Sequence, residues 1–274
     1  MGLLDEMYQS SLRRVADARE HRSESALRAA IRSLPTAPAL VLDAPGFDVI
    51  AELKLRSPSM GDLSAATPDP LVRLEGYARG GAAVISVLTE PSRFGGELGH
   101  LTRAAAVLQP FGVPVMRKDF LVDPYQVLEA RACGASGVLL IVRMLPRERL
   151  IAMLDCAAEE GLFVLLEAFD VADLELSADV ARERRGRREP VLMGLKCRDL
   201  ETLQIDFSRF ERLRGRLPDG WPAVAESGVQ AGADAARIAR LGYRLALVGT
   251  SLMQRTDPEA AIRELLSAGR AAVG

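Results

Sequence analysis

The stretch Val115-Met116-Arg117-Lys118-Asp119-Phe120 shows the pattern from which the fold of this chain follows. An apolar run ends there on a lysine, and the run Val49-Ile50-Ala51-Glu52-Leu53-Lys54 ends in the same way. A charge at the tip of a buried strand is costly to desolvate unless a partner or a substrate meets it. Because nearly every apolar run ends on such a residue, the pattern predicts both a fold and a site at one edge of it.

Eight short apolar runs recur along the chain, separated by segments that suit helices. They are nearly continuous in apolar residues, as expected of strands covered on both faces, and roughly 23 to 35 residues apart, which leaves room for a helical crossover. The runs are residues 49–51, 83–88, 113–116, 138–142, 163–166, 191–195, 222–225 and 245–248. Eight such repeats predict a (β/α)8 TIM barrel, an α/β fold, with a doubly wound sheet as the alternative.

The clearest intervening helix is predicted over 124–134, with Asp123 as its N-cap, Pro124 at its first position and Gly134 at its end. Residues 1–45 precede the first strand, and we expect them to form a helical segment across one end of the barrel. The 274 residues are therefore predicted to form a single barrel domain with an N-terminal helical extension.

Composition narrows the classes of function. The formal net charge of −2 argues against a nucleic-acid partner, and no apolar run approaches the roughly 18 residues that span a membrane. Three widely spaced cysteines and the lack of an apolar leader predict a cytoplasmic protein without disulfides. With only two histidines, acid–base chemistry has to rely on lysines and carboxylates. The arginine-rich run 181–188 lies between a helix and a strand, where we expect a solvated surface loop, with a phosphate-binding role as the alternative.

In a TIM barrel the chemistry lies at the carboxyl ends of the strands. These ends carry Glu52 with Lys54, Thr89, Lys118, Arg143, Glu167, Lys196, Glu226 with Ser227, and Gly249 with Thr250. Lysines and glutamates around a concave pocket suit an anionic substrate and proton transfers, although each alone could belong to a structural ring of ion pairs. Their convergence on one face favours a functional site.

Two glycine turns follow the last two predicted strands, at Glu226-Ser227-Gly228-Val229 and Val248-Gly249-Thr250-Ser251. Loops at these places in the barrel often hold a phosphate through backbone N–H groups. The segment Ser57-Pro58-Ser59 after the first strand is placed to close over the same anion. The sequence therefore predicts a small phosphorylated substrate.

Specific motifs lie at the strand ends, in order, between about residue 47 and residue 260. They are Glu52-Leu-Lys54-x-x-Ser57-Pro58-Ser59-x-Gly61, Ser86-Val-Leu-Thr89, Phe94-Gly-Gly96, Arg117-Lys118-Asp119-Phe120, Asp123-Pro-Tyr-Gln, Leu139-Leu-Ile, Arg198-Asp199-Leu200, Glu226-Ser227-Gly228 and Val248-Gly249-x-Ser251-Leu-Met. This set resembles the indole-3-glycerol phosphate synthase family of tryptophan biosynthesis. The resemblance implies a carboxy-lyase that closes the indole ring of 1-(2-carboxyphenylamino)-1-deoxyribulose 5-phosphate, losing CO2 and water, without a metal or cofactor.

The resemblance also implies roles for individual residues. Lys118 would be the general acid that protonates the ribulose carbonyl as the aryl carbon attacks. Lys54 and Glu167 would carry the proton transfers of the dehydration, and Glu52 would orient the anilino nitrogen. By the same resemblance, the anthranilate pocket would be lined by Phe94, Phe120 and Leu139, the phosphate held by Ser57, Gly228, Gly249 and Thr250 with Ser227 alongside, and further substrate contacts made by Pro58, Lys196, Arg198, Glu226 and Leu247.

One position departs from the family pattern, because Lys196 stands where the family usually has asparagine. Beside Lys54 and Lys118, a third ammonium would lower its neighbours' pKa values unless a carboxylate such as Glu167 pairs with it. We expect an ordinary, monomeric family member in which a salt bridge absorbs Lys196. The alternatives are a paralogue that acts on a related phosphorylated substrate and a barrel that only binds such a ligand.

Overall fold

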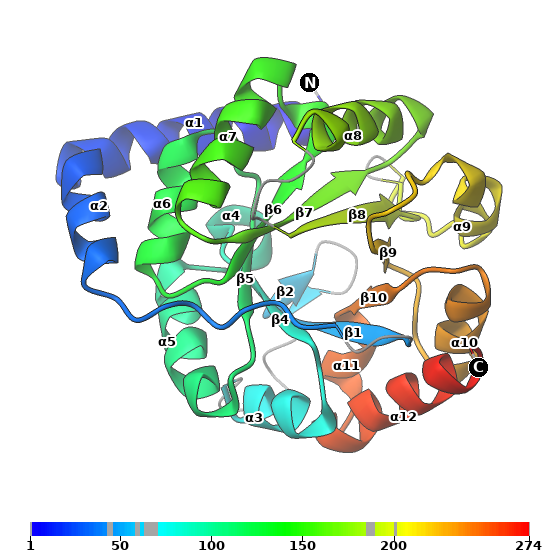
Figure 1. Cartoon of the computed structure of the whole chain (residues 1–274). Coiled ribbons are helices and arrows are strands. Elements are labelled where there is room, and N and C mark those ends of the chain that lie inside the picture. Colours follow the sequence, from blue (N-terminus) through cyan, green and yellow to red (C-terminus); the bar gives the residue numbers. More distant parts are fainter. Residues whose placement is uncertain are drawn as a thin grey trace.

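The structure is a computed structural model that describes residues 2–42, 46–57, 61–62, 71–184, 190–199 and 202–273, with the backbone alone at positions 57 and 62. Eight parallel strands form a closed barrel in the order β1-β10-β9-β8-β7-β6-β5-β4, at the centre of Figure 1. They are β1 (Asp48–Leu53), β4 (Val84–Leu88), β5 (Val115–Lys118), β6 (Gly137–Ile141), β7 (Phe163–Ala168), β8 (Val191–Lys196), β9 (Ala223–Glu226) and β10 (Leu245–Val248). The predicted (β/α)8 barrel is confirmed, since β1 pairs with both β4 and β10.

The strands are buried along nearly their whole length, which is the reason for their continuous apolar composition. Every position of β1 and β7 is buried, because helices cover the outer face of the barrel and side chains from all strands fill its interior. The predicted strands differ from the observed ones mainly at the carboxyl ends. β5 continues to Lys118 and β8 to Lys196, so the hydrogen-bonded ladder holds the backbone of these charged residues.

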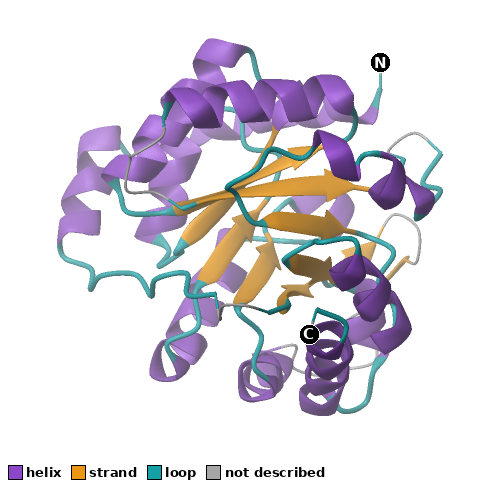
Figure 2. Ribbon diagram, turned by 45° about the vertical axis from the view of Figure 1, so that its right-hand side comes forward, coloured by secondary structure: helices purple, strands orange, loops and turns teal. Residues whose placement is uncertain are grey.

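Helices form the outer layer of the barrel (Figure 2). They are α3 (Leu71–Gly80), α4 (Pro91–Phe94), α5 (Leu98–Leu108), α6 (Pro124–Ala132), α7 (Arg147–Glu159), α8 (Val171–Glu183), α9 (Ser208–Arg212), α10 (Gly232–Arg240), α11 (Thr250–Gln254) and α12 (Pro258–Ala271), with 3-10 turns η2 (Gln109–Phe111), η3 (Val142–Met144) and η4 (Arg214–Arg216). α6 has the predicted start, since the Asp123 side chain accepts a hydrogen bond from the Tyr125 N–H. A short antiparallel pair that the sequence did not predict, β2 (Arg56–Ser57) and β3 (Gly61–Asp62), follows β1.

Two helices precede the first strand, as expected, and the first lies at the mouth of the barrel. α2 (Glu24–Arg32) packs against α6 on the outer wall, and α1 (Leu3–His21) runs along the upper side in Figure 1. Leu3 of α1 reaches the central cavity, and Arg14 pairs with Asp119 just after β5. The extension therefore crosses the end of the barrel at which the strands finish.

The arginine-rich run differs in part from the expected surface loop. Arg182 is exposed, but Arg184 is only 7% exposed and lies 2.5 Å from Asp155 of α7. Arg184 thus joins α8 to α7, while residues 185–189 lie outside the described residues. Within the described ranges, no helix is long and apolar enough to cross a membrane.

Candidate active site

The carboxyl ends of the strands surround a cavity of about 400 Å³. Residues that are distant in the sequence meet in its wall because all parallel strands end at the same rim. Of the residues predicted to act on substrate, the wall contains Glu52, Lys54, Phe94, Lys118, Phe120, Glu167, Lys196, Arg198, Glu226, Ser227, Gly228, Leu247, Gly249 and Thr250. The two lysine–glutamate sets on which the sequence interpretation depends therefore face one space.

Of the remaining predicted residues, Leu139 does not line the cavity. Leu139 is fully buried in β6, and Ile141 of the same strand lines the cavity instead. Residues i and i+2 of a strand point to the same side, so Leu139 lies on the inward face but one layer too deep. For Ser57 only the backbone is described, and Pro58 lies outside the described residues.

Glu167 is at the centre of the charged part of the wall. Lys118 donates a hydrogen bond to its Oε2 at 3.2 Å, and Lys196 donates to the same oxygen at 2.8 Å. Burial favours the neutral acid, but the two ammonium groups outweigh it and hold the pKa of Glu167 well below its ordinary value. The pairing of Lys196 with Glu167 that the sequence interpretation allowed for is present.

Lys118 stays protonated although its side chain is buried. Burial alone would lower the pKa of Lys118, but neighbouring carboxylates, that of Glu167 foremost, outweigh burial and raise it above the ordinary lysine value. Lys118 is therefore an ammonium group at neutral pH and can donate a proton. Lys196 does not cause Lys118 to lose its proton, because Glu167 lies between the two ammonium groups and pairs with both.

A second ion pair lies where the first strand of the barrel, β1, pairs with the last, β10. The Nζ of Lys54 is 3.1 Å from Oε1 of Glu52 and donates to Oγ1 of Thr250 at 3.2 Å. Burial raises the pKa of Glu52, but neighbouring ammonium groups, that of Lys54 foremost, lower it below its ordinary value. A Cβ on Gly249 would lie 2.4 Å from Oε1 of Glu52, so only glycine leaves room for this pair.

The two predicted glycine turns form one corner of the cavity. Ser227 and Gly228 both have left-handed backbone angles, with φ of 74° and 82°, and for a serine this conformation is uncommon outside functional turns. The hydroxyl of Ser251 donates to the carbonyl of Val229 at 3.2 Å and so ties the turn after β10 to the turn after β9. Adjacent turns of this kind can present backbone N–H groups to an anion.

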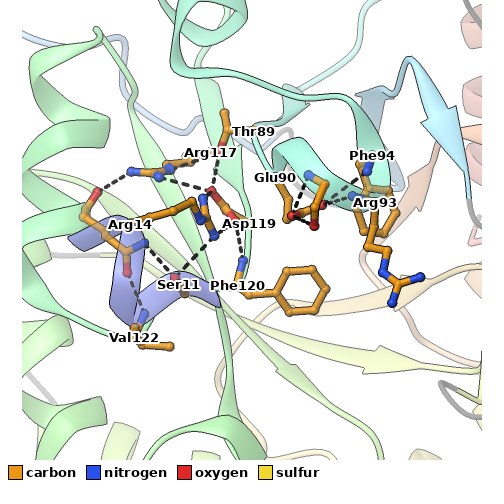
Figure 3. Close-up of polar contacts among 12 residues, drawn as sticks. Ser11, Arg14, Thr89, Glu90, Arg93, Phe94, Arg117, Asp119, Phe120 and Val122 are labelled. Carbon is orange, nitrogen blue, oxygen red and sulfur yellow. Dashed lines mark hydrogen bonds and ion pairs between the residues drawn. The ribbon is translucent and has the colours of Figure 1, made fainter. Parts of the chain in front are cut away.

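Two aromatic rings belong to the apolar part of the wall. The ring centroids of Phe94 and Phe120 lie 6.2 Å apart at an interplanar angle of 37°. Phe94 ends the short helix α4, whose first turn is capped by Glu90 through the N–H groups of residues 92–94 (Figure 3). These rings, together with Leu88 and Ile141, offer an aryl group an apolar surface close to Lys118.

A family model described as indole-3-glycerol phosphate synthase matches residues 4–265. The chain belongs to this family. Its relatives include the indole-3-glycerol phosphate synthases of Nocardioides sp., 42% identical over 97% of this chain and 98% of the relative, and of Leifsonia xyli subsp. xyli, 41% identical over 96% and 97%. Among solved structures, 3-hexulose-6-phosphate synthase from Salmonella typhimurium covers 81% of this chain and 98% of its own at a TM-score of 0.62, and with 14% identity it shares the fold alone.

Sequence reasoning missed a buried ion network that supports the family's lysine-containing strand end. Asp119 accepts hydrogen bonds at 2.9 Å on each oxygen from Arg14, at 3.1 Å from Arg117 and at 2.8 Å from Thr89 (Figure 3). Burial raises the pKa of Asp119, but the two guanidinium groups outweigh it and hold that pKa well below its ordinary value. Arg14 belongs to α1, so the N-terminal helix helps to hold the segment between Lys118 and Phe120.

Two residues that the sequence placed at strand ends do not line the cavity. Arg143 leaves β6 in the turn η3, lies 4.6 Å over the ring of Phe169, and pairs with Asp173 at 2.8 Å. Thr89 is buried, and its hydroxyl donates to Asp119. Both side chains stabilise the rim without facing the cavity.

A compositional signal in the sequence was also overlooked. The chain has three lysines, Lys54, Lys118 and Lys196, and all three line the cavity, while the other 32 of its 35 basic side chains are arginines. Arginine cannot lose its proton in proteins, whereas lysine can. The restriction of lysine to the cavity therefore indicates proton transfer there.

Proposed function

We propose that the chain catalyses the ring closure of 1-(2-carboxyphenylamino)-1-deoxyribulose 5-phosphate to indole-3-glycerol phosphate, with release of CO2 and water and without a metal or cofactor. The observation that carries this proposal is the presence of two lysine–glutamate sets in one cavity, beside two glycine turns that suit a phosphate. Membership of the family and the names of its relatives support the same reaction. We further propose that it acts as a monomer, in the cytoplasm and without a nucleic-acid partner.

In the first step, the ring carbon that bears the carboxylate attacks the ketone carbon of the ribulose chain. The new carbon–carbon bond pushes electrons onto the ketone oxygen, which takes a proton from the ammonium group of Lys118. The carbon–carboxylate bond then breaks, its electron pair restores the aromatic ring, and CO2 leaves. The raised pKa of Lys118 keeps it protonated before this step.

In the second step, the new hydroxyl leaves as water and a substrate proton is removed to form the indole double bond. The lowered pKa of Glu167 keeps it ionised, so Glu167 is the proton acceptor. Lys54, which lies between Glu52 and Thr250, is then the donor to the departing hydroxyl. Glu52 accepts a hydrogen bond from the anilino nitrogen and orients it.

The substrate's two ends match two different parts of the cavity. The aryl ring would lie against Phe94 and Phe120, and the phosphate against the turns at Gly228 and Gly249. This arrangement places the ketone between them, near Lys118.

The test is an assay of purified protein for indole formation by fluorescence, with mass spectrometry of the product. Lys118→Ala should lower turnover by about 10²- to 10⁴-fold, the usual effect of losing a general acid. Arg184→Ala, which removes a buried cation distant from the cavity, is the matched control and should keep turnover in the folded protein. A loss below about threefold in Lys118→Ala would remove Lys118 from the mechanism.

The paralogue remains a second candidate because Lys196 stands at the usual asparagine position. Lys196→Asn separates the two. An ordinary member should make indole-3-glycerol phosphate at least as fast after this change, whereas a paralogue should lose its own product, seen by mass spectrometry.

A further inference from the structure

Glu226 is a buried carboxyl group to which no described residue donates a hydrogen bond. It is 0% exposed, and within the part of the chain that the structure describes neither of its oxygens accepts a hydrogen bond. Glu90 is equally buried, but its oxygens accept hydrogen bonds from three backbone N–H groups and from the hydroxyl of Ser92. An ionised carboxylate in the position of Glu226 would be costly, because burial without donors favours the neutral acid.

The strand register brings Glu226 towards Glu167. Glu167 is paired with Gly194 on the neighbouring strand β8, and Glu226 is paired with Lys196 two residues further along it. A Cβ on Gly194 would lie only 2.2 Å from Oε1 of Glu226. Glu226 therefore leans across the bare backbone of Gly194, towards the strand that carries Glu167. Two carboxyl groups brought together in this way cannot both ionise easily.

The charges around the pair decide which carboxyl holds the proton. Two ammonium groups donate to one oxygen of Glu167. Burial and then the charge of Glu167 raise the pKa of Glu226 well above its ordinary value, against the opposing effect of Lys196 and Lys118. The charged groups that face this part of the cavity are Glu167 from β7, Lys196 from β8, Lys118 from β5, Glu52 from β1, and Lys54 and Arg198 just after their strands, while β10 contributes Leu247 beside Glu226.

The use of lysine at position 196 is an independent observation. Outside the cavity, every basic side chain of this protein is an arginine. Arginine has a broad planar head, whereas lysine ends in a compact point charge. A compact ammonium group suits position 196. Lys196 has Glu226 as its neighbour on the adjacent strand and donates a hydrogen bond to Glu167.

We infer that Glu226 is a neutral carboxylic acid that donates a hydrogen bond to Glu167, and that Lys196 is the positioning residue that keeps Glu167, rather than Glu226, ionised. With Glu226 neutral, the cationic side chains that line the cavity outnumber its carboxylates, which leaves positive charge for an anionic group of the substrate. The aryl carboxylate of the proposed substrate is such a group. This deepens the proposed function and rests on it only for the kinetic measurement below.

The first measurement is independent of activity. The infrared spectrum of the full-length protein near neutral pH should contain the carbonyl stretch of a neutral carboxylic acid, a region in which carboxylates do not absorb. That band should be lost in Glu226→Gln and kept in Glu90→Gln, the equally buried control. Labelling glutamate with ¹³C should shift the band in the unmodified protein, so the result does not depend on the folding of a variant. A missing band, or one that survives in folded Glu226→Gln, would overturn the inference.

The second measurement tests Lys196. On acidification, a second neutral-acid band from Glu167 should appear at a higher pH in Lys196→Gln than in the unmodified protein, by about half a pH unit, because a neighbouring opposite charge has been removed. Arg198→Gln removes a cation from the same wall, but one that donates its hydrogen bond to the Leu203 carbonyl, so it should move the onset much less. Equal onsets in Lys196→Gln and the unmodified protein would overturn the role of Lys196.

The kinetic measurement separates this inference from the proposed function. In an active enzyme, the acid-side midpoint of kcat/KM should rise in Lys196→Gln together with the infrared onset. A protein that makes no indole-3-glycerol phosphate but keeps the Glu226 band refutes the proposed function alone. A protein that makes the product without this band refutes the inference alone.

Discussion

Because Lys118 and Lys196 donate to the same oxygen of Glu167, the two lysines should substitute for each other in stabilising the fold. Lys118→Met and Lys196→Met are therefore each expected to lower the free energy of unfolding by about 1 kcal/mol or less, since one charged hydrogen bond remains. In the double variant Glu167, whose side chain is 1% exposed, loses both ammonium partners. Leaving a buried charge without a partner costs about 3–5 kcal/mol.

Protonation of Glu167 sets an upper limit to this loss. Neutralising a carboxyl with an ordinary pKa of 4.5 at a pH of about 7.5 costs about 4 kcal/mol, at about 1.4 kcal/mol for each pH unit. We therefore expect a loss of about 4 kcal/mol in the double variant, with a coupling energy of about 2 kcal/mol between the two substitutions.

The assay is urea unfolding of the four proteins, followed by circular dichroism at two pH values. In the double variant the folded state holds a proton that the unfolded state does not, so its stability should rise as the pH falls, by about 1.4 kcal/mol per unit. Lys118→Met combined with Arg184→Met should be additive, because Arg184 follows α8 and pairs with Asp155, whereas Lys118 ends β5 and pairs with Glu167. Additive losses for the two lysines, or a pH-independent double variant, would refute the shared role of Glu167.

Three further outcomes are expected. Arg14→Met should lower the unfolding free energy by about 1–3 kcal/mol and turnover as well, because Asp119 loses one of its charged donors; thermal unfolding and kcat measure this. Gly194→Ala should destabilise the fold by about 1–3 kcal/mol, since its Cβ would overlap Glu226; an unchanged urea midpoint would contradict this. Glu226→Gln should be more stable than the parent, and the difference should grow as the pH rises from the ordinary carboxyl pKa towards the raised pKa of Glu226. In that range the parent must either keep a proton on Glu226 or ionise this buried carboxyl group, whereas glutamine does neither. Thermal midpoints measured across pH check this.

The sequence was sufficient for the fold because strands covered on both faces leave a continuous apolar signal. The eight runs predicted the eight strands of the barrel, and their charged ends predicted the residues around the cavity. The sequence did not predict how deep within the barrel each inward-facing residue lies. Leu139 and Ile141 are equally apolar and share a face of β6, and only the stagger between neighbouring strands determines which of them reaches the cavity.

The remaining differences have the same physical origin, because each is a contact between segments distant in the sequence. Pattern alone could not show that Arg14 pairs with Asp119, or that Arg143 turns away towards Asp173. The approach of Glu226 towards Glu167 depends on which residue of β8 lies between them.

The sequence by itself therefore determined the fold, the family motifs and the rim at which the charges lie, because strand periodicity and strand ends are local properties of a chain. Only the tertiary structure decided which charges share a partner, as Lys118 and Lys196 share Glu167. Burial and electrostatic coupling depend on distances across strands, and those distances exist only once the barrel has closed.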